Sequence, residues 1–255
     1  MKVLGGLGRG PDRRSTPTEN PEGRPFWFAA GQRTRVCSRT LGRVAILHRA
    51  TLTPTKQELL TAHLTTFPAF GDVDLGGVSL IGAYRFDDPA GEVGIESHVV
   101  ATPLGVVHIP LTYRAGPIDG AEQWLIGSME HSVLGTRWIY NACGDQVYVQ
   151  ELLRVILTGD THVEQFVATD DGPVARPSTA SVRGTGSPGT AVPIVGSTRA
   201  DFDGYATTID AAGVRLVVRH VLDGPAASAE GPALTGTWPA SEKPTILGFI
   251  DTSSV

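Results

Sequence analysis

Cysteine and long apolar runs are both scarce in this chain. Its only cysteines are Cys37 and Cys143, and two such distant residues build neither a disulfide framework nor a zinc site. No stretch approaches the roughly eighteen consecutive apolar residues of a transmembrane helix. The first residues also lack the apolar segment of a secretory signal. We therefore expect a cytoplasmic location, with neither metal nor cofactor.

The charge is unevenly distributed. The formal net charge is −5, but residues 1–43 carry nine Lys or Arg and only three Asp or Glu, so the rest of the chain is strongly acidic. An acidic body argues against nucleic acid as a partner. The basic leader is rich in Arg, Gly and Pro, which predicts disorder. We expect residues 1–43 to be dispensable, and Val44 to be the true start of the protein.

Thirty-one glycines and eighteen prolines favour many short strands over long helices. Alternating apolar residues predict strands near residues 44–49, 78–86, 93–101, 106–113, 122–131, 136–140, 205–210, 214–221 and 245–250. Two helices are expected, one capped by Thr53 with Pro54 in its first turn and one running from Asp145 to Gly159. Residues 171–196 and 224–244 are rich in Gly and Pro and predict loops. No internal repeat is evident.

His98 and His108 lie on neighbouring predicted strands. If residues 102–105 form a simple turn, Val99 lies opposite His108. His98 and His108 then point to opposite faces of the sheet, and only a bulge would bring their imidazoles together.

Four segments carry a resemblance to a known family. They are Ala45–Arg49, Leu52–Lys56, Leu111–Arg114 and Leu134–Asp145, and they are similar to the N-terminal cap of maltokinases, enzymes of the trehalose–glycogen pathway that phosphorylate maltose. The resemblance implies an α+β fold, in which a curved antiparallel sheet is packed by two helices in a cystatin-like manner. We therefore divide the chain into the leader 1–43, a cap-like domain 44–160, and a β-rich second domain or extension 161–255.

The phosphate-transferring part of such a kinase is not evident. Gly184–Gly189 fits a glycine-rich loop, but Arg219 stands where a strand lysine is needed, so a flexible linker is the better interpretation. Asp201–Gly204 resembles the magnesium segment of kinases, yet no histidine–aspartate catalytic loop precedes it. Hydrolase and deaminase motifs are absent as well. We expect no catalytic residues.

These observations favour a non-catalytic, cap-like protein with a binding or regulatory role in glucan and trehalose metabolism, acting on a protein partner and not on a membrane. Two alternatives stay open: an ATP-dependent sugar kinase or its remnant, and a small-molecule-binding enzyme with a pocket in the curved sheet. A cap covers neighbouring lobes, so a surface for another protein is expected. The candidate binding residues at its rim are Arg114, Arg137, Trp138 and Tyr140, although aromatic residues on sheets also fill cores.

Overall fold

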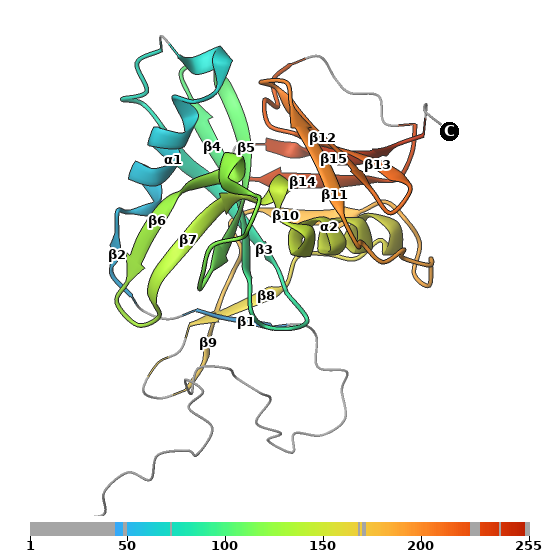
Figure 1. The fold of residues 1–255 in the computed structure, drawn as a ribbon, viewed down its shortest axis with the longest axis horizontal. Helices are drawn as coiled ribbons and strands as arrows, with labels where there is room; N and C mark the ends of the chain where they lie inside the picture. Colours follow the sequence, from blue (N-terminus) through green and yellow to red (C-terminus); the bar gives the residue numbers. More distant parts are fainter. Residues whose placement is uncertain are drawn as a thin grey trace, which may run out of the picture. The chain divides into compact units, whose positions relative to one another are not determined.

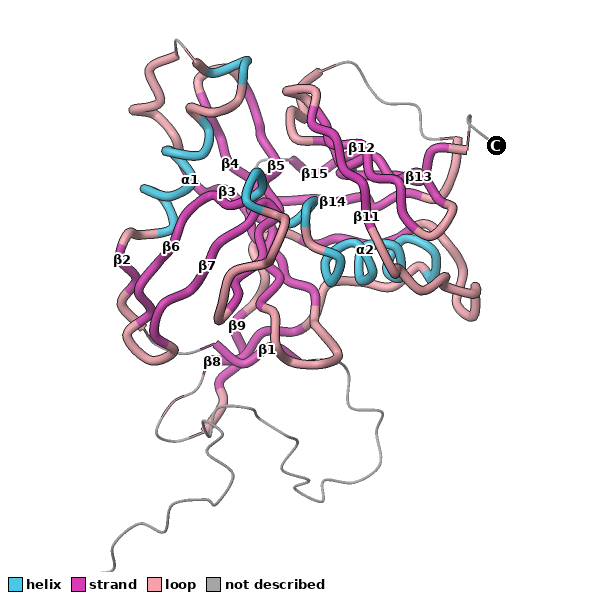
Figure 2. Tube along the Cα trace, viewed as in Figure 1, coloured by secondary structure: helices cyan, strands magenta, loops and turns pink. Residues whose placement is uncertain are grey.

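The computed structural model describes residues 44–47, 50–71, 73–167, 169, 172–224, 230–239 and 241–252. All of them fall in one unit of the chain, Val36–Val255. The predicted leader, residues 1–43, lies outside the described residues. Two six-stranded antiparallel sheets, one smaller sheet and two α-helices make up the described part of the chain, which confirms the α+β class (Figures 1 and 2).

The first large sheet has the strand order β2-β6-β7-β5-β4-β3. Its strands are β2 (Leu52–Thr53), β3 (Ser79–Phe86), β4 (Gly94–Thr102), β5 (Gly105–Arg114), β6 (Leu125–His131) and β7 (Gly135–Asn141). Three short 3-10 helices interrupt the connections: η1 (Pro68–Phe70), η2 (Glu122–Trp124) and η3 (Ala142–Gly144). The smaller sheet joins β1 (Val44–Leu47) in parallel to β8 (Glu164–Val167), which pairs with β9 (Val174–Arg176).

Helix α1 (Lys56–Leu64) covers one face of the first large sheet. Its buried leucines, Leu59, Leu60 and Leu64, cluster with residues of β5 and β7 such as Ile109 and Ile139. The helix begins two residues later than predicted, because Thr53 is paired with Glu130 in β2. Thr55 caps it instead, and Thr55 and Glu58 form a reciprocal capping box.

The turn between β4 and β5 is the simple one predicted. Val99 lies opposite His108, so His98 and His108 point to opposite faces. His98 lies on the α1 side, within 3.3 Å of the Tyr113 hydroxyl, whereas His108 lies on the other side beside Tyr84.

Helix α2 (Gln146–Thr158) packs on the face of the first sheet opposite to α1. The predicted ends are confirmed: Asp145 caps the start, and Gly159 ends the helix with a φ of 67°. Its buried residues are Tyr148, Val149, Glu151, Leu152, Leu153, Val155 and Ile156. They contact both β3 and β4 and the strands of the second sheet, so the helix is enclosed from two directions. Each fully buried aliphatic side chain stabilises the fold by about 2 kcal/mol.

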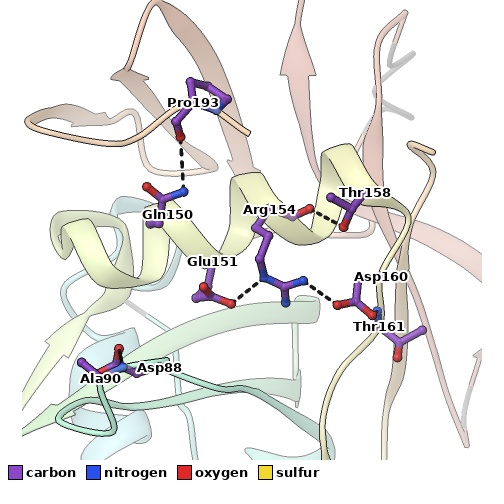
Figure 3. A network of polar contacts seen from close by, with 9 residues as sticks. All are labelled: Asp88, Ala90, Gln150, Glu151, Arg154, Thr158, Asp160, Thr161 and Pro193. Carbon is purple, nitrogen blue, oxygen red and sulfur yellow. Dashed lines mark hydrogen bonds and ion pairs between the residues drawn. The ribbon is translucent and has the colours of Figure 1, made fainter. Parts of the chain in front are cut away.

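One buried side chain of α2, Glu151, is charged and paired. The carboxylate of Glu151 accepts a hydrogen bond from Arg154 Nε at 2.8 Å, and the same guanidinium reaches Asp160 just beyond the helix (Figure 3). Glu151 is only 2% exposed, so the arginine supplies the counter-charge that a buried carboxylate requires.

The second large sheet has the order β10-β14-β15-β13-β12-β11. Its strands are β10 (Ser181–Gly184), β11 (Thr198–Phe202), β12 (Ala206–Ala211), β13 (Val214–Arg219), β14 (Ala233–Trp238) and β15 (Ser241–Asp251). Residues 181–251 thus form a sheet of their own, yet its inner face shares one hydrophobic cluster with the first sheet and α2. The division into a cap-like domain 44–160 and a β-rich second domain or extension 161–255 stays a prediction.

Two strands of this sheet lie where loops were expected, and glycine explains both errors. A Cβ on Gly184 would lie 1.9 Å from the Val155 carbonyl oxygen, and one on Gly186 would lie 2.1 Å from that of Leu157. These glycines let β10 and the residues after it approach α2, where the Gly186 and Ser187 amides bond its last carbonyls. The glycine-rich segment therefore packs against α2 and is not a linker. In β14, a Cβ on Gly236 would lie 2.7 Å from the Leu247 side chain.

The two large sheets share one connectivity. In each sheet the second, third and fourth strands in chain order form a meander. The fourth strand then pairs with the sixth, and the first strand pairs with the fifth. Thus β2 to β7 correspond in order to β10 and β11 to β15. An internal repeat that is not evident in the sequence is present in the topology.

Buried histidines join the two sheets where β5 meets the residues after β13. The His108 amide donates to the His220 carbonyl at 2.8 Å, and His220 Nδ1 donates to the His108 carbonyl at 3.0 Å. His108 Nδ1 donates to the Arg219 carbonyl, which leaves Nε2 to accept from the Tyr84 hydroxyl at 2.9 Å. His220 Nε2 likewise accepts from Thr207. Both rings are therefore held in the neutral form.

Burial lowers the pKa of His108 to about 3 and that of His220 to about 4. It also lowers the pKa values of His63 and His98 to about 4. In the unfolded chain these groups bind protons near pH 6.5, whereas the folded protein does not bind them until the pH is far lower. Their contribution to stability is therefore complete above about pH 6.5 and is lost as the pH falls toward about 4.

We predict that the free energy of unfolding decreases by about 2 kcal/mol per buried histidine between about pH 7 and pH 5. Urea titrations across this range would measure the decrease. His220→Gln should lower stability at all pH values and also flatten the pH dependence, because one titrating group is gone. A denaturation midpoint that does not change between these pH values would contradict the assignment of neutral rings.

Candidate functional site

A cavity of about 540 Å³ lies beside the N-terminus of α2. Its walls come from three parts of the chain: the end of β5 with the loop that follows, the turn into α2, and the start of β11. The lining residues used below are Arg114, Ile118, Trp124, Asp145, Thr198 and Ala200. The cavity therefore lies between the cap-like part of the chain and the second sheet.

A bidentate ion pair forms the floor of this cavity. Arg114 Nε and Nη2 each donate to a carboxylate oxygen of Asp145 at 2.7 Å. Asp145 also accepts the Val147 amide at 3.0 Å as the cap of α2, and it is 1% exposed. The hydrogen bond to Asp145 raises the pKa of Arg114 above its ordinary value. The pair ties the end of β5 to the start of α2 with its charges satisfied.

The loop that follows β5, which forms another wall, is held by two aromatic side chains. The Tyr140 hydroxyl accepts a hydrogen bond from the Ile118 amide at 2.9 Å. Trp124 lies on the turn at Gly144, where a Cβ would stand 2.1 Å from the indole Cγ. Only glycine permits this approach, so the wall holds its position through packing at Gly144 and one hydrogen bond at Tyr140.

The four predicted binding residues do not all lie together. Arg114 and Trp138 are register partners in β5 and β7, and Tyr140 shares their face of the sheet. Arg137 lies on the opposite face and is 7% exposed. Tyr140 is buried and supports the cavity loop, whereas Trp138 is half-buried. Their role in binding a protein partner stays a prediction.

Sequence reasoning missed the residues that the second sheet contributes. Thr198, Arg199 and Ala200 line the cavity from β11, but no local motif marks them, since the strand is short and polar. Asp145 was identified only as a helix cap. Its pairing with Arg114 could have been suspected, because both residues belong to the segments with family resemblance.

A second polar cluster lies beneath α1. The buried carboxylate of Glu96 accepts a hydrogen bond from Lys56 Nζ at 2.5 Å and lies 3.7 Å from both Arg85 Nη1 and His98 Nε2. Burial alone would raise the pKa of Glu96, but the charges of Arg85 and Lys56 outweigh it and hold the pKa well below its ordinary value. The carboxylate stays ionised and anchors α1 to the sheet.

The kinase-like residues have structural partners. Asp203 accepts the amides of Tyr205 and Ala206 at 2.8 and 2.7 Å, which makes it a turn residue. Arg219 donates to the carbonyls of Ile246 and Leu222. Burial raises the pKa of the Cys143 thiol to about 12, so this cysteine is a poor nucleophile. Among the described residues, no group of three or more His, Cys, Asp or Glu could hold a metal ion.

Residues 69–145 match the model of the maltokinase N-terminal cap domain, which confirms the resemblance seen in the sequence. The matched segment runs from η1 to the cap of α2. It includes β3 to β7 and excludes both α-helices and the whole second sheet. The match covers less than a third of the chain. No curated protein matches the chain, and no described helix is long and apolar enough to cross a membrane.

We predict that Arg114→Ala destabilises the protein by about 3 kcal/mol, because it leaves the Asp145 carboxylate buried without its counter-charge. Urea denaturation near neutral pH would measure the loss. Arg215→Ala is the matched control, since the Arg215–Asp210 pair is exposed and such pairs contribute at most about 1 kcal/mol. Equal effects of the two substitutions would show that the Arg114–Asp145 pair does not hold the floor of the cavity.

Proposed function

We propose that this protein is a non-catalytic, cap-like protein that binds and regulates a protein partner in glucan, maltose and trehalose metabolism. The observation that carries the proposal is the match of residues 69–145 to a domain that caps maltokinases. A cap domain borders other parts of a protein, so a chain that carries one is suited to contact another protein body. The metabolic context follows from that match.

The contacts of the kinase-like residues support a non-catalytic role. A phosphate-transferring site needs carboxylates free to hold magnesium and a lysine free to reach phosphates. Asp203 instead closes the β11–β12 turn, and Arg219 bonds two backbone carbonyls. Gly184 and Gly186 lie against the carbonyl groups at the end of α2, and these carbonyls occupy the space that a nucleotide phosphate would need.

A pocket enzyme is less well supported, although a cavity is present. The first sheet is covered by α1 on one face and by α2 on the other, so the cavity is not the sheet pocket that such an enzyme would use. Arg114 and Asp145, two of the charged residues that line the cavity, bond each other. A catalytic group is more often held with its reacting atoms available to substrate.

We predict no phosphorylation of maltose or other sugars when the purified protein is incubated with ATP and magnesium. Sugar phosphate can be followed by phosphorus NMR, with an active maltokinase as the positive control. We expect Asp203→Asn to weaken the turn without changing this null result. Turnover by the native chain that Asp201→Asn or Asp203→Asn abolishes would contradict the proposal and favour the kinase alternative.

The partner is tested separately. Tagged protein expressed in its native host would be cross-linked and purified, and the captured proteins identified by mass spectrometry. The proposal expects an enzyme of maltose, glucan or trehalose metabolism whose purified form changes its rate when this protein is added. Capture of no such enzyme, or of one whose activity is unaffected, would contradict the regulatory role.

A further inference from the structure

The strand β11 is an edge of the second sheet. It pairs with β12 alone, through the register Thr198↔Ala211 to Phe202↔Thr207. An edge strand presents a row of backbone donors and acceptors on its outer side, which can pair with another chain. The question is which residues of β11 direct these groups outward.

The geometry of the β12–β13 hairpin determines which residues of β11 do so. The turn between β12 and β13 consists of Ala212 and Gly213, with φ values of 53° and 75°. Such a two-residue turn places a hydrogen-bonded pair at its base, here Ala211 with Val214. Odd-numbered residues of β12 therefore bond β13, and even-numbered residues bond β11.

It follows that Asp210 bonds Arg199 and Thr208 bonds Asp201, each within the register of the two strands. The Asp203 amide, which donates to the Ala206 carbonyl at 3.1 Å, fits the same alternation. Thr198 and Ala200 are then the residues whose N–H and C=O groups point away from β12. Within the described part of the chain, no backbone hydrogen bond to another segment uses these groups.

The residues that carry these outward groups line the cavity. Thr198, Arg199 and Ala200 form one of its walls, and Ile118, Trp124 and the turn at Gly144 form others. A volume of about 540 Å³ is within the range of binding sites for small ligands and short peptide segments. The site thus combines a free strand edge with a lining in which Ile118 and Trp124 offer apolar side chains.

The edge is also held in place before any ligand binds. Gln150 of α2 accepts the Val195 amide at 2.8 Å. It also donates to the Pro193 carbonyl at 3.3 Å (Figure 3). These two bonds fix the chain that leads into β11 onto α2. A strand that is already positioned loses little entropy when another strand pairs with it.

We propose that an extended peptide segment of a protein partner adds to β11 as a further strand, bonded to Thr198 and Ala200 and enclosed by the wall at Ile118 and Trp124. An extended peptide is favoured because it offers alternating N–H and C=O groups at the spacing of the strand edge. The proposal deepens the proposed function, on which it rests, by naming how the partner is recognised.

The experiment uses the full chain and a displayed library of short random peptides as the probe. A selected peptide is titrated into isotope-labelled protein, and amide hydrogen exchange is measured by NMR. In the free protein, Thr198 and Ala200 should exchange rapidly, whereas Arg199 and Asp201 should be protected by β12. Peptide binding should slow exchange at Thr198 and Ala200 by about tenfold or more and leave Arg199 and Asp201 unchanged.

The decisive variant is Ala200→Pro, which removes an outward amide that β12 does not use. Ala200→Ser is its matched control, because it changes the same side chain and keeps the amide. The proline should weaken peptide binding about tenfold and the serine much less. Thr198→Pro provides a second test if Ala200→Pro loses the native exchange pattern elsewhere in the protein.

Failure to select any peptide, or binding that both proline variants leave unchanged, would overturn strand addition at β11. A concentration-dependent dimer lost in Ala200→Pro would also overturn it, because a second copy would then occupy the edge. A metabolic enzyme that still binds Ala200→Pro would refute strand addition and leave the proposed function standing. Peptide binding at β11 without any metabolic partner would support strand addition and refute the proposed function.

Discussion

The burial of α2 on two sides is the contact on which the rest of the structure depends. Val149, Leu152 and Ile156 lie in one hydrophobic cluster with strands of both large sheets. Without this helix the inner faces of both sheets would be exposed to water, because each sheet buries its apolar residues against α2. The histidine junction and the Arg114–Asp145 pair then fix how β5 meets the second sheet and the start of the helix. The candidate site exists because these elements converge there.

The polar contacts around α2 follow a common logic. Two charges buried near the helix are each neutralised by an arginine: Asp145 at its start by Arg114 of β5, and Glu151 by Arg154 of the helix itself. Removing one partner of such a pair leaves a buried charge unpaired, which is strongly destabilising. The cavity keeps its form because its walls are fixed by such pairs and by glycine contacts, while the outer edge of β11 is left open.

Strong local signals made much of the fold predictable. Asp145 and Gly159 marked both ends of α2, Thr102–Gly105 gave the β4–β5 register, and the turn at Gly213 gave a hairpin. The strands β10 and β14 were missed because their glycines serve close packing, which resembles loop composition in a single sequence. The site was predicted only in part, at Arg114 and the supporting Tyr140. Its β11 wall depends on long-range contacts, and no local pattern encodes them.

The repeated connectivity bears on how the chain reaches this structure. In each half the meander, β3 to β5 or β11 to β13, joins neighbours in the sequence and can close quickly. The first strand of each half must wait, because Leu52 pairs with His131 and Ser181 pairs with Thr237. Closing such distant pairs costs loop entropy before any contact compensates for it, which slows folding. The chain therefore has two closures of the same kind, one in each large sheet.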